Sequence, residues 1–453
     1  MLWKKEEETR ARLVARGFEE ETEVPSDSPT VDKANLRVIL AVAASEGWII
    51  ETSDVKSAFL QGRMLDRKVT IVPPKEADVP KGKLWQLQVA LYGLDDASLQ
   101  FFLKCKEVLL KLGCVQSTFD PAMFMKYDSN SRLIGIIATH VDDFIHAGNE
   151  VFRSTVTKKL AEIFKMGKTE ARKFKYVGYE LEQLKQGIII SQKEYAEKVE
   201  ILEINPSRLK AQDDELTQEE KSLIRQVAGQ IGWLARETRP DLSFAQVEMS
   251  TKFGKGKVKD LVQAVKTMTR VKQSDSRLLI GALGEVGGWK VEVSTDASLC
   301  NLNDGVHSTG AYVILIINKA GNCAPISWRS GKIRRIVDST LECECLALVD
   351  GLKQAVYVRE IIEEIFNLDS KSVPVEAIVD NKSTVQAIHS TAPVEDKKLR
   401  RDISIIKQML NEKEIFSVSW RPGKDPLDDC MTKQTATSFN LLSIFQSGRR
   451  EGQ

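Results

Sequence analysis

The stretch Gly135–Asn149, with the sequence GIIATHVDDFIHAGN, limits what this chain can fold into more than any other segment. Two apolar runs, residues 134–138 and 144–147, flank the adjacent aspartates Asp142 and Asp143. This pattern predicts two strands joined by a short turn that carries both carboxylates. Adjacent carboxylates repel each other unless a cation shares them, and Mg²⁺ and Mn²⁺ prefer oxygen ligands. A solvated turn is the competing interpretation of the pair alone, because Asp is common in turns.

A third carboxylate upstream favours a metal site. Asp54 lies near the end of a predicted strand, in the segment TSDVKSAFLQG, after an apolar helix predicted over residues 31–47. Three carboxylates from two strands are what a two-metal phosphoryl-transfer site needs, with one ion at the attacking 3′-hydroxyl and one at the triphosphate. The spacing along the chain does not establish that the two strands are neighbours.

Composition narrows the class of protein. The chain has 453 residues and a net charge of +1, which excludes a strongly basic, histone-like protein. Its 7 cysteines include no CxxC pair, and it has only 4 histidines, so we expect neither a disulfide framework nor a zinc or His-rich metal site. No apolar run approaches ~18 residues, so we expect no membrane span. The scattered cysteines favour a reducing, intracellular setting.

The pattern of elements changes at a glycine-rich break, GALGEVGG, at residues 281–288, which is the candidate domain boundary. Before it, we expect helices over 97–112 and 151–166, two strands over 174–190 joined at Gln186-Gly187, and mostly helix over 194–251. After it, we expect strands at KVEVSTDAS, GAYVILIIN, PISWRS and PVEAIVDN, with helices over 340–366 and 395–411. This order of strands and helices predicts a mixed α/β layout.

Six sequence blocks, taken together and in order, resemble one known family. They are TRARLVARGF, TSDVKSAFLQG, VALYGLDDA, HVDDFIHAG, ETRPDLSFA and STLECECLAL. From about residue 10 to about residue 435, the chain resembles the reverse transcriptase of copia-type LTR retrotransposons followed by its ribonuclease H. The resemblance implies an α/β (α+β) fold: a right-hand polymerase with fingers, palm and thumb over 1–275, a ribonuclease H-like mixed-sheet domain over 288–435, and a tail over 436–453. It also implies fingers truncated at the N-terminus, in a fragment of a polyprotein or the product of a decayed element.

The resemblance assigns roles to five residues of the first half. Asp54, Asp142 and Asp143 match the palm carboxylates that bind metal. Arg12 and Arg16 match the fingers block and would bind the incoming triphosphate, because Arg pairs with phosphate bidentately. A solvated basic face is the alternative for either arginine.

Three further residues match the nucleotide pocket of the family. Phe59 falls where these polymerases keep a bulky ring that clashes with a ribose 2′-hydroxyl and so selects deoxynucleotides. Plain core packing is the alternative for this ring. Tyr92 and Gly93 match the pocket segment, in which a Gly lets the backbone come close to a ligand.

The chain departs from the family pattern at several positions. Asp95 and Asp96 stand where the family usually has Lys and Gln, and two acids would repel a template phosphate or a triphosphate. His140 replaces a usual Tyr but keeps an aromatic ring, and Trp420 stands where the family often has an accessory His. Asp95-Asp96, Trp420 and the truncated start favour a rival hypothesis, a catalytically decayed remnant that only binds nucleic acid or that has ribonuclease H activity alone.

The resemblance also implies a second metal site, made of an Asp-Glu-Asp-Asp set in the second half. Asp296 and Asp380 end predicted strands, and Asp429 follows later in the chain. Glu342 and Glu344 compete for the glutamate on the helix. On a helical wheel, Glu344 lies about 50° from the centre of the apolar stripe and Glu342 about 110°, so Glu344 is the one expected to border the buried face.

The cofactors and partners follow from the resemblance. It implies two Mg²⁺ or Mn²⁺ ions per active site, with an RNA template, a DNA primer, an RNA–DNA hybrid and dNTPs as partners. Two basic segments, Lys252–Arg277 and Lys397–Lys407, are candidate tracks for the hybrid backbone, which they would bind non-specifically and in a salt-dependent way. A solubilising surface is the alternative for both. The family implies a cytoplasmic location in a virus-like particle, or a nuclear one.

Overall fold

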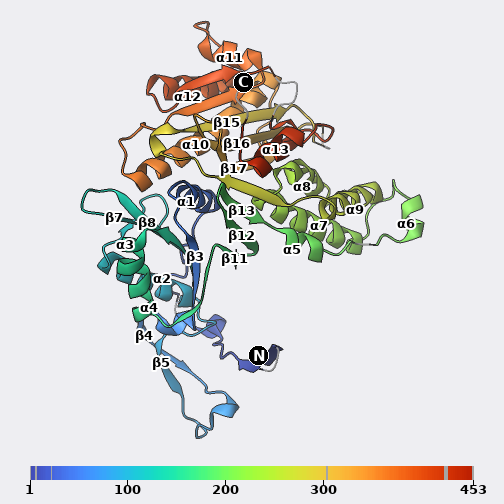
Figure 1. Cartoon of the computed structure of the whole chain (residues 1–453). Coiled ribbons are helices and arrows are strands. Elements are labelled where there is room, and N and C mark those ends of the chain that lie inside the picture. The colour runs from blue at the N-terminus through green and yellow to red at the C-terminus, as the bar shows by residue number, and fades with distance from the viewer. Residues whose placement is uncertain are drawn as a thin grey trace. The chain divides into compact units, whose positions relative to one another are not determined.

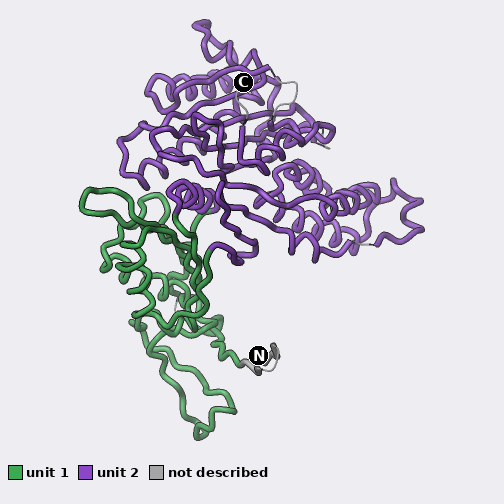
Figure 2. The backbone as a smooth tube through the Cα atoms, viewed as in Figure 1, with its two compact units in different colours: residues 1–32, 48–171 green, residues 33–47, 172–453 purple. Residues whose placement is uncertain are grey.

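The computed structural model describes residues 2–5, 8–21, 23–201, 203–302, 305–422 and 427–450, with side chains from residue 11 onward. The chain divides into two compact units (Figure 2). Unit 1 comprises residues 1–32 and 48–171, and unit 2 comprises residues 33–47 and 172–453. Within the described ranges, no helix is both long enough and apolar enough to cross a membrane.

A six-stranded sheet forms the centre of unit 1, in the order β10-β3-β9-β8-β7-β6 (Figure 1). Its strands are β3 (Ile50–Val55), β6 (Val115–Gln116), β7 (Met123–Tyr127), β8 (Leu133–His140), β9 (Asp143–Gly148) and β10 (Met166–Ala171). All neighbouring strands run antiparallel. β8 and β9 form the hairpin that the sequence predicts, and β3 pairs with β9, which the spacing alone could not establish.

Two helical segments pack on this sheet. They are α2 (Ala97–Lys111) and a run of α3 (Glu150–Phe152), the π-helical η4 (Arg153–Thr157) and α4 (Lys158–Ile163). Their apolar side chains share a core with the sheet that includes Phe101 and Phe144. The helix predicted over 97–112 is confirmed. The helix predicted over 151–166 is too long, because Phe164 is extended and the chain then enters β10, which pairs with β3.

The smaller elements of unit 1 lie outside this sheet. They are the paired strands β1 (Leu2–Lys5) and β2 (Glu8–Ala11), the hairpin of β4 (Met64–Ile71) and β5 (Trp85–Val89), and the short helices η1 (Gly17–Glu19), η2 (Ala58–Gln61) and η3 (Lys75–Ala77). Val69, Ala90 and Leu94 belong to a separate small core beside the hairpin.

Unit 2 contains a four-stranded antiparallel sheet of β11 (Lys173–Tyr176), β12 (Tyr179–Leu184), β13 (Gly187–Ser191) and β14 (Arg277–Gly281). The sequence predicted two strands over 174–190, and the structure has three. Val177 and Gly178 both have positive φ, so the chain turns inside the stretch interpreted as one strand. The later turn lies at Lys185-Gln186, one residue earlier than expected, because Leu184 pairs with Gly187.

The chain between β13 and β14 is mostly helical, as predicted. It forms α5 (Lys193–Lys198), α6 (Pro206–Lys210), α7 (Gln218–Glu237), η5 (Pro240–Leu242), α8 (Ser243–Thr251) and α9 (Val258–Lys272). A capping box begins α7, since Thr217 accepts from the backbone N–H of Glu220 and the Glu220 carboxylate accepts from that of Thr217. The apolar faces of these helices form one core, to which Ile224, Ile231 and Leu261 belong.

A five-stranded sheet in the order β17-β16-β15-β18-β19 forms the other part of unit 2. Its antiparallel strands are β15 (Trp289–Ser298), β16 (Thr309–Asn318) and β17 (Cys323–Lys332), and β18 (Val375–Val379) and β19 (Ser417–Trp420) run parallel to β15. The helices are α10 (Thr340–Phe366), which packs against β15, α11 (Lys382–His389) and α12 (Lys397–Asn411). The four strands and two helices predicted after residue 288 are all present.

Helix α1 (Lys33–Ser45) belongs to unit 2 although it precedes β3 of unit 1 in the sequence. Residues 38–43 have no exposed surface. A helix that is apolar all round must be covered on all sides, and α1 contacts β13, β14, β17 and α10. The helix predicted over 31–47 is confirmed.

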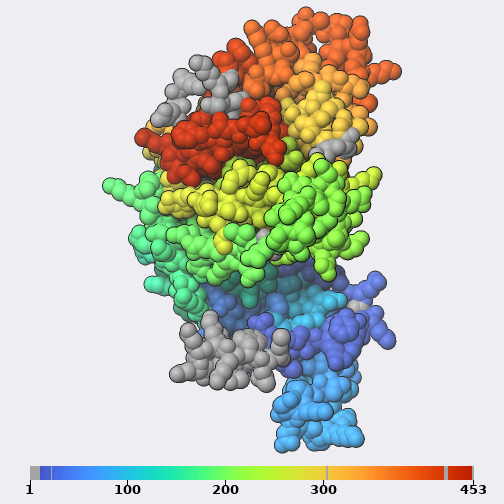
Figure 3. All heavy atoms as spheres, turned by 90° about the vertical axis from the view of Figure 1, so that its right-hand side faces the viewer, coloured from blue at the N-terminus to red at the C-terminus, as the bar shows by residue number. Residues whose placement is uncertain are grey.

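The stretch predicted as a tail, residues 436–453, instead contains the packed helix α13 (Phe439–Ser447). Phe445 is fully buried and Arg450 forms a 2.8 Å ion pair with Glu292. Figure 3 shows the red atoms of this segment lying against the yellow atoms of unit 2 rather than projecting from them. The candidate boundary at 281–288, which contains η6 (Val286–Gly288), lies inside unit 2, and a domain division there stays a prediction.

Candidate functional site

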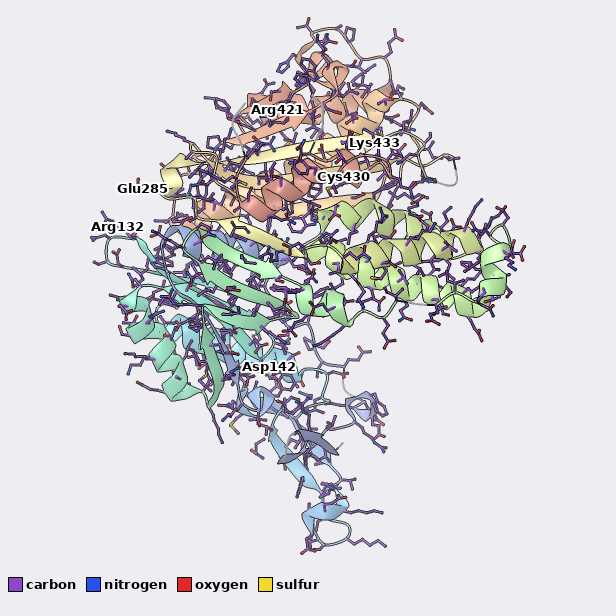
Figure 4. All side chains as sticks on the ribbon, turned by 45° about the vertical axis from the view of Figure 1, so that its right-hand side comes forward. Arg132, Asp142, Glu285, Arg421, Cys430 and Lys433 are labelled. Carbon is purple, nitrogen blue, oxygen red and sulfur yellow. The ribbon has the colours of Figure 1, made fainter. Side chains whose placement is uncertain are left out.

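Three carboxylates meet at one end of the unit 1 sheet. Asp54 on β3 is the direct cross-strand partner of Asp143 on β9. Asp142 lies in the two-residue turn before β9, where Val141 has a φ of 57° and the Asp142 carbonyl accepts from the backbone N–H of Val55 at 3.1 Å. Figure 4 labels Asp142 at the end of these strands. The structure therefore brings together the three acids that the sequence connected only through the resemblance to a family.

The acids of this trio are crowded and partly buried. Burial, with Asp142 and Asp54 as further causes, raises the pKa of Asp143 to about 6. Burial and Asp142 also raise the pKa of Asp54. A raised pKa means that the ionised carboxylate is destabilised in the folded chain. A cation shared by these residues would stabilise the ionised form.

Gly167 on β10 lies directly against Asp54, a contact that the sequence did not reveal. A Cβ at this position would lie 2.2 Å from Asp54 Oδ2. The glycine therefore leaves the room that the Asp54 carboxylate occupies. Since the strand β10 was itself not predicted, no signal in the sequence connected Gly167 with Asp54.

A wall of side chains adjoins the trio. The rings of Phe59 and Tyr92 pack with their centroids 4.6 Å apart and their planes tilted by 46°, and the Arg12 guanidinium lies 4.7 Å from the centre of the Tyr92 ring. Burial and the charge of Asp142 raise the pKa of Tyr92, so this ring lies within electrostatic reach of the carboxylates. Arg16, the other predicted arginine, instead forms an exposed ion pair with Glu19.

The backbone conformation and the close packing of the chain require a glycine at position 93. It has a φ of 94°, and a Cβ there would lie 2.1 Å from the carbonyl oxygen of Ala15. The segment that carries Arg12 runs alongside, with Ala15 N–H bonded to Tyr92 O at 2.7 Å and Gly17 N–H bonded to Gly93 O at 3.0 Å. Close approach of a ligand to Gly93 stays a prediction.

Asp96, one of the two acids that depart from the family pattern, is neutralised by a neighbouring arginine. Asp96 is 1% exposed and accepts two hydrogen bonds from Arg67, at 2.7 and 3.0 Å, while Arg67 also binds both carboxylate oxygens of Glu20. Burial raises the pKa of Asp96, but the bonds from Arg67 and Gln100 outweigh burial and lower it below its ordinary value. Asp96 is therefore part of a buried ion pair, and only Asp95 is exposed.

A second set of acids meets at one edge of the five-stranded sheet. Asp296 lies near the end of β15 and Asp380 directly follows β18, which is parallel to β15 and in register with it. Asp429 begins the short helix η7 (Asp429–Met431). Carboxylate oxygens of these three residues all lie within 4.8 Å of one another. In the described part of the chain, the unit 1 trio does not form an equally tight group.

Glu344, not Glu342, is oriented toward this second set. Burial and the charges of Asp296 and Asp380 raise the pKa of Glu344 to about 9. Glu342 is also buried, contrary to the helical-wheel expectation, but it pairs with Arg335 at 2.8 Å and accepts from the backbone N–H of Asp338. The helical-wheel expectation considered only residues of the helix. It therefore missed Arg335, which lies in the loop before the helix and pairs with Glu342.

Several partners of the second set were not foreseen. Asp428 is 2% exposed and accepts from the Ser294 hydroxyl at 3.0 Å. Thr432 donates a hydrogen bond to Asp296, and Lys433 contacts both Asp296 and Asp429. Asp428, Thr432 and Lys433 lie within four residues of Asp429 in the sequence, but no pattern of residues marked them as partners of the acids.

Several side chains of the two basic segments are engaged within the chain. In the first, Lys252 pairs with Asp260, Lys259 with Asp213 and Arg277 with Asp275. In the second, Arg400 and Lys407 donate to backbone carbonyls. Lys397, Lys398 and Arg401 on α12 are exposed.

Both sets of acids suit hard divalent cations, which take oxygen ligands. In the second set, Glu344 Oε2 is buried and has no hydrogen-bond partner among the described residues. A buried oxygen without a donor is costly, so a cation bound there would satisfy it. The residues present therefore fit a metal.

The chain is similar in sequence to transposon polyproteins. A family model described as "Reverse transcriptase (RNA-dependent DNA polymerase)" matches residues 3–207. The "Retrovirus-related Pol polyprotein from transposon RE2" of Arabidopsis thaliana is 26% identical over 372 residues, which cover 79% of this chain and 25% of that protein. The corresponding polyprotein from transposon TNT 1-94 of Nicotiana tabacum is 26% identical over 386 residues, covering 79% and 28%. The chain therefore spans about a quarter of the length of these relatives.

The fold is similar to that of a solved viral enzyme. The foamy viral protease-reverse transcriptase, solved in complex with an RNA/DNA hybrid, matches with a TM-score of 0.50 and 12% sequence identity, over 88% of this chain and 46% of that one. At this identity the likeness concerns the fold alone. The predicted mixed α/β fold class is thereby confirmed.

Proposed function

We propose that this chain carries a reverse transcriptase of the copia-transposon type, which extends a DNA primer on an RNA or DNA template and cleaves the RNA strand of the hybrid. The observation that carries the polymerase part is the pairing of Asp54 with Asp143 beside the wall of Arg12, Tyr92 and Phe59. This arrangement supplies metal ligands, a cation for phosphate and a ring for sugar discrimination within one site.

Each polymerase residue has a definite task in the proposal. Two Mg²⁺ or Mn²⁺ ions bound by Asp54, Asp142 and Asp143 would activate the primer 3′-hydroxyl and neutralise the triphosphate. Arg12 binds the triphosphate through its guanidinium, held in place against the Tyr92 ring. Phe59 packs on Tyr92 and blocks a ribose 2′-hydroxyl.

The second part of the proposal rests on the acids of unit 2. Asp296, Asp380 and Asp429 have oxygens within 4.8 Å of one another, and Glu344 adds a buried carboxylate oxygen, Oε2, that has no hydrogen-bond donor in the described residues. Such a set would bind two divalent ions, which activate water for hydrolysis of an RNA phosphodiester. The exposed side chains of Lys397, Lys398 and Arg401 would bind the hybrid backbone.

Primer extension on an RNA template tests the polymerase part. We expect the wild type to extend the primer and Asp142→Asn/Asp143→Asn to lose extension, because the variant keeps the turn but loses two ionised ligands. Asp78→Asn, at an exposed loop position of unit 1, is the matched control and should extend normally. Equal extension by the wild type and the double variant would refute the polymerase proposal.

Cleavage of an RNA–DNA hybrid tests the ribonuclease H part and the rival hypotheses. Asp296→Asn should abolish cleavage and leave extension intact. Cleavage that persists in this variant would assign it to a contaminant. Cleavage without extension by the wild type would favour ribonuclease H activity alone, and failure of both would favour a decayed remnant.

A further inference from the structure

Lys433 lies in direct contact with the second acid set. Its ammonium is 3.4 Å from Asp296 Oδ1 and forms a shorter contact with Asp429 Oδ1. The other oxygen of Asp296 accepts a hydrogen bond from the hydroxyl of Thr432. Both oxygens of Asp296 are therefore engaged by the Thr432-Lys433 pair. Figure 4 labels Lys433 near Cys430, on the segment that leads to α13.

A metal ion would compete with this ammonium for the negative charge of the same carboxylates. Mg²⁺ binds carboxylate oxygens at about 2.0–2.1 Å and needs near-octahedral geometry. An ion between these residues would be bound by the carboxylates of Asp296 and Asp429, and Lys433 already contacts Oδ1 of each. Two cations so close would repel each other strongly in a half-buried site.

The structure also offers the ammonium a place to move. Lys433 lines a cavity of about 350 Å³ in unit 2, bounded by α7, α8, α9 and the C-terminal segment. Three acids line the same cavity, namely Asp241, Glu248 and Asp260. Asp241 pairs with Arg239, and Asp260 pairs with Lys252. Burial raises the pKa of Glu248. Glu248 is therefore the acid that would gain most from a displaced ammonium.

We propose that Lys433 is the built-in counter-ion of the acid set, which stabilises the metal-free protein and which a divalent cation must displace toward this cavity. The proposal rests on the metal-site part of the proposed function. Lys433 is here a positioning residue that sets how tightly the acids bind metal. With Lys433 present, the four acids should bind divalent cations more weakly than they would alone. In the metal-free protein, the ammonium should reduce the repulsion between the acids.

Metal binding without nucleic acid tests the proposal. Mn²⁺ is titrated calorimetrically into the full chain carrying Asp142→Asn/Asp143→Asn, so that unit 1 contributes little, with and without Lys433→Met. We expect Lys433→Met to bind Mn²⁺ about tenfold more tightly or better, equivalent to about 1.4 kcal/mol. Lys433→Arg keeps the charge and should bind like the parent. Lys319→Met, an exposed lysine in the β16–β17 turn, is the control.

Thermal unfolding in EDTA supplies a second readout. Lys433→Met should unfold at a lower temperature than the parent in EDTA, and saturating Mn²⁺ should remove the difference. A variant that is unfolded in EDTA but folds with Mn²⁺ would support the proposal equally. Unchanged or weaker Mn²⁺ binding by Lys433→Met, or a variant that stays unfolded in Mn²⁺, would overturn it. A parent protein that binds no Mn²⁺ would instead refute the metal site of the proposed function.

Discussion

Glu342 and Glu344 lie two residues apart on one helix, yet their surroundings give them different properties. Arg335 neutralises Glu342, whereas Glu344 is oriented toward Asp296 and Asp380. The helical period predicted which glutamate borders the sheet, because side-chain direction follows from the helix alone. It could not predict the burial of Glu342, because its partner comes from a loop whose path depends on tertiary packing.

Stability in EDTA should fall with rising pH because of Glu344. The pKa of this residue is raised from 4.5 to about 9 in the folded chain, so the folded state holds a proton that the unfolded state releases. Its stabilising contribution is complete below the unfolded pKa and is lost as pH rises through the folded one. Urea unfolding at several pH values from about 5 to about 9 measures the slope.

Two controls identify the source of this pH dependence. Glu344→Gln should flatten the slope, since the amide does not titrate. Saturating Mg²⁺ should flatten it as well, because bound metal keeps the carboxylate ionised throughout. A slope that is the same in the wild type and in Glu344→Gln would contradict the assignment.

At the scale of elements, the polymerase site depends on pairing between strands far apart in sequence. Periodicity predicted α1, α2 and α10, since helices are local structures. It could not pair β3 with β9, and it extended the helix after residue 151 through the start of β10. Pairing is decided by long-range contacts, so the acids of β3 and β9 were connected only through the resemblance to a family.

Gly167→Ala should damage polymerase activity through Asp54. The added methyl would lie 2.2 Å from Asp54 Oδ2, so the carboxylate must move. We expect primer extension to fall on the order of a hundredfold, the typical cost of misplacing a reacting group by about 1 Å. Hybrid cleavage should stay unchanged. Gly229→Ala, where a Cβ has open space, is the control, and equal extension by both variants would contradict the account.

Arg67→Met should destabilise the chain because it leaves the buried Asp96 without its charged partner, with only Gln100 still donating to it. Asp96 is 1% exposed, and removing one partner of a buried pair costs about 3–5 kcal/mol. Arg67→Met/Asp96→Leu should recover much of the loss, because no buried charge remains. Urea unfolding measures both variants. A double variant less stable than Arg67→Met would show that Asp96 is not the buried charge responsible.

At the scale of the whole molecule, one chain carries two sets of acids in two compact units. Asp54, Asp142, Asp143 and Glu344 lie within the ordered sequence blocks, whereas Asp296, Asp380 and Asp429 lie outside them and were assigned from the resemblance as a whole. The blocks did not identify Gly167, Asp96's partner or Lys433 as parts of the sites. These residues act through contacts that only the folded chain creates, at positions where the sequence pattern carries no signal of its own.

Anomalous diffraction from Mn²⁺-soaked crystals of the full chain tests the central claim most directly. The account predicts one group of Mn²⁺ peaks among Asp54, Asp142 and Asp143, and a second among Asp296, Glu344, Asp380 and Asp429. It also predicts that Lys433 moves away from Asp296 where the second site is filled. Peaks at neither set of acids, in crystals that bind Mn²⁺ elsewhere, would contradict it.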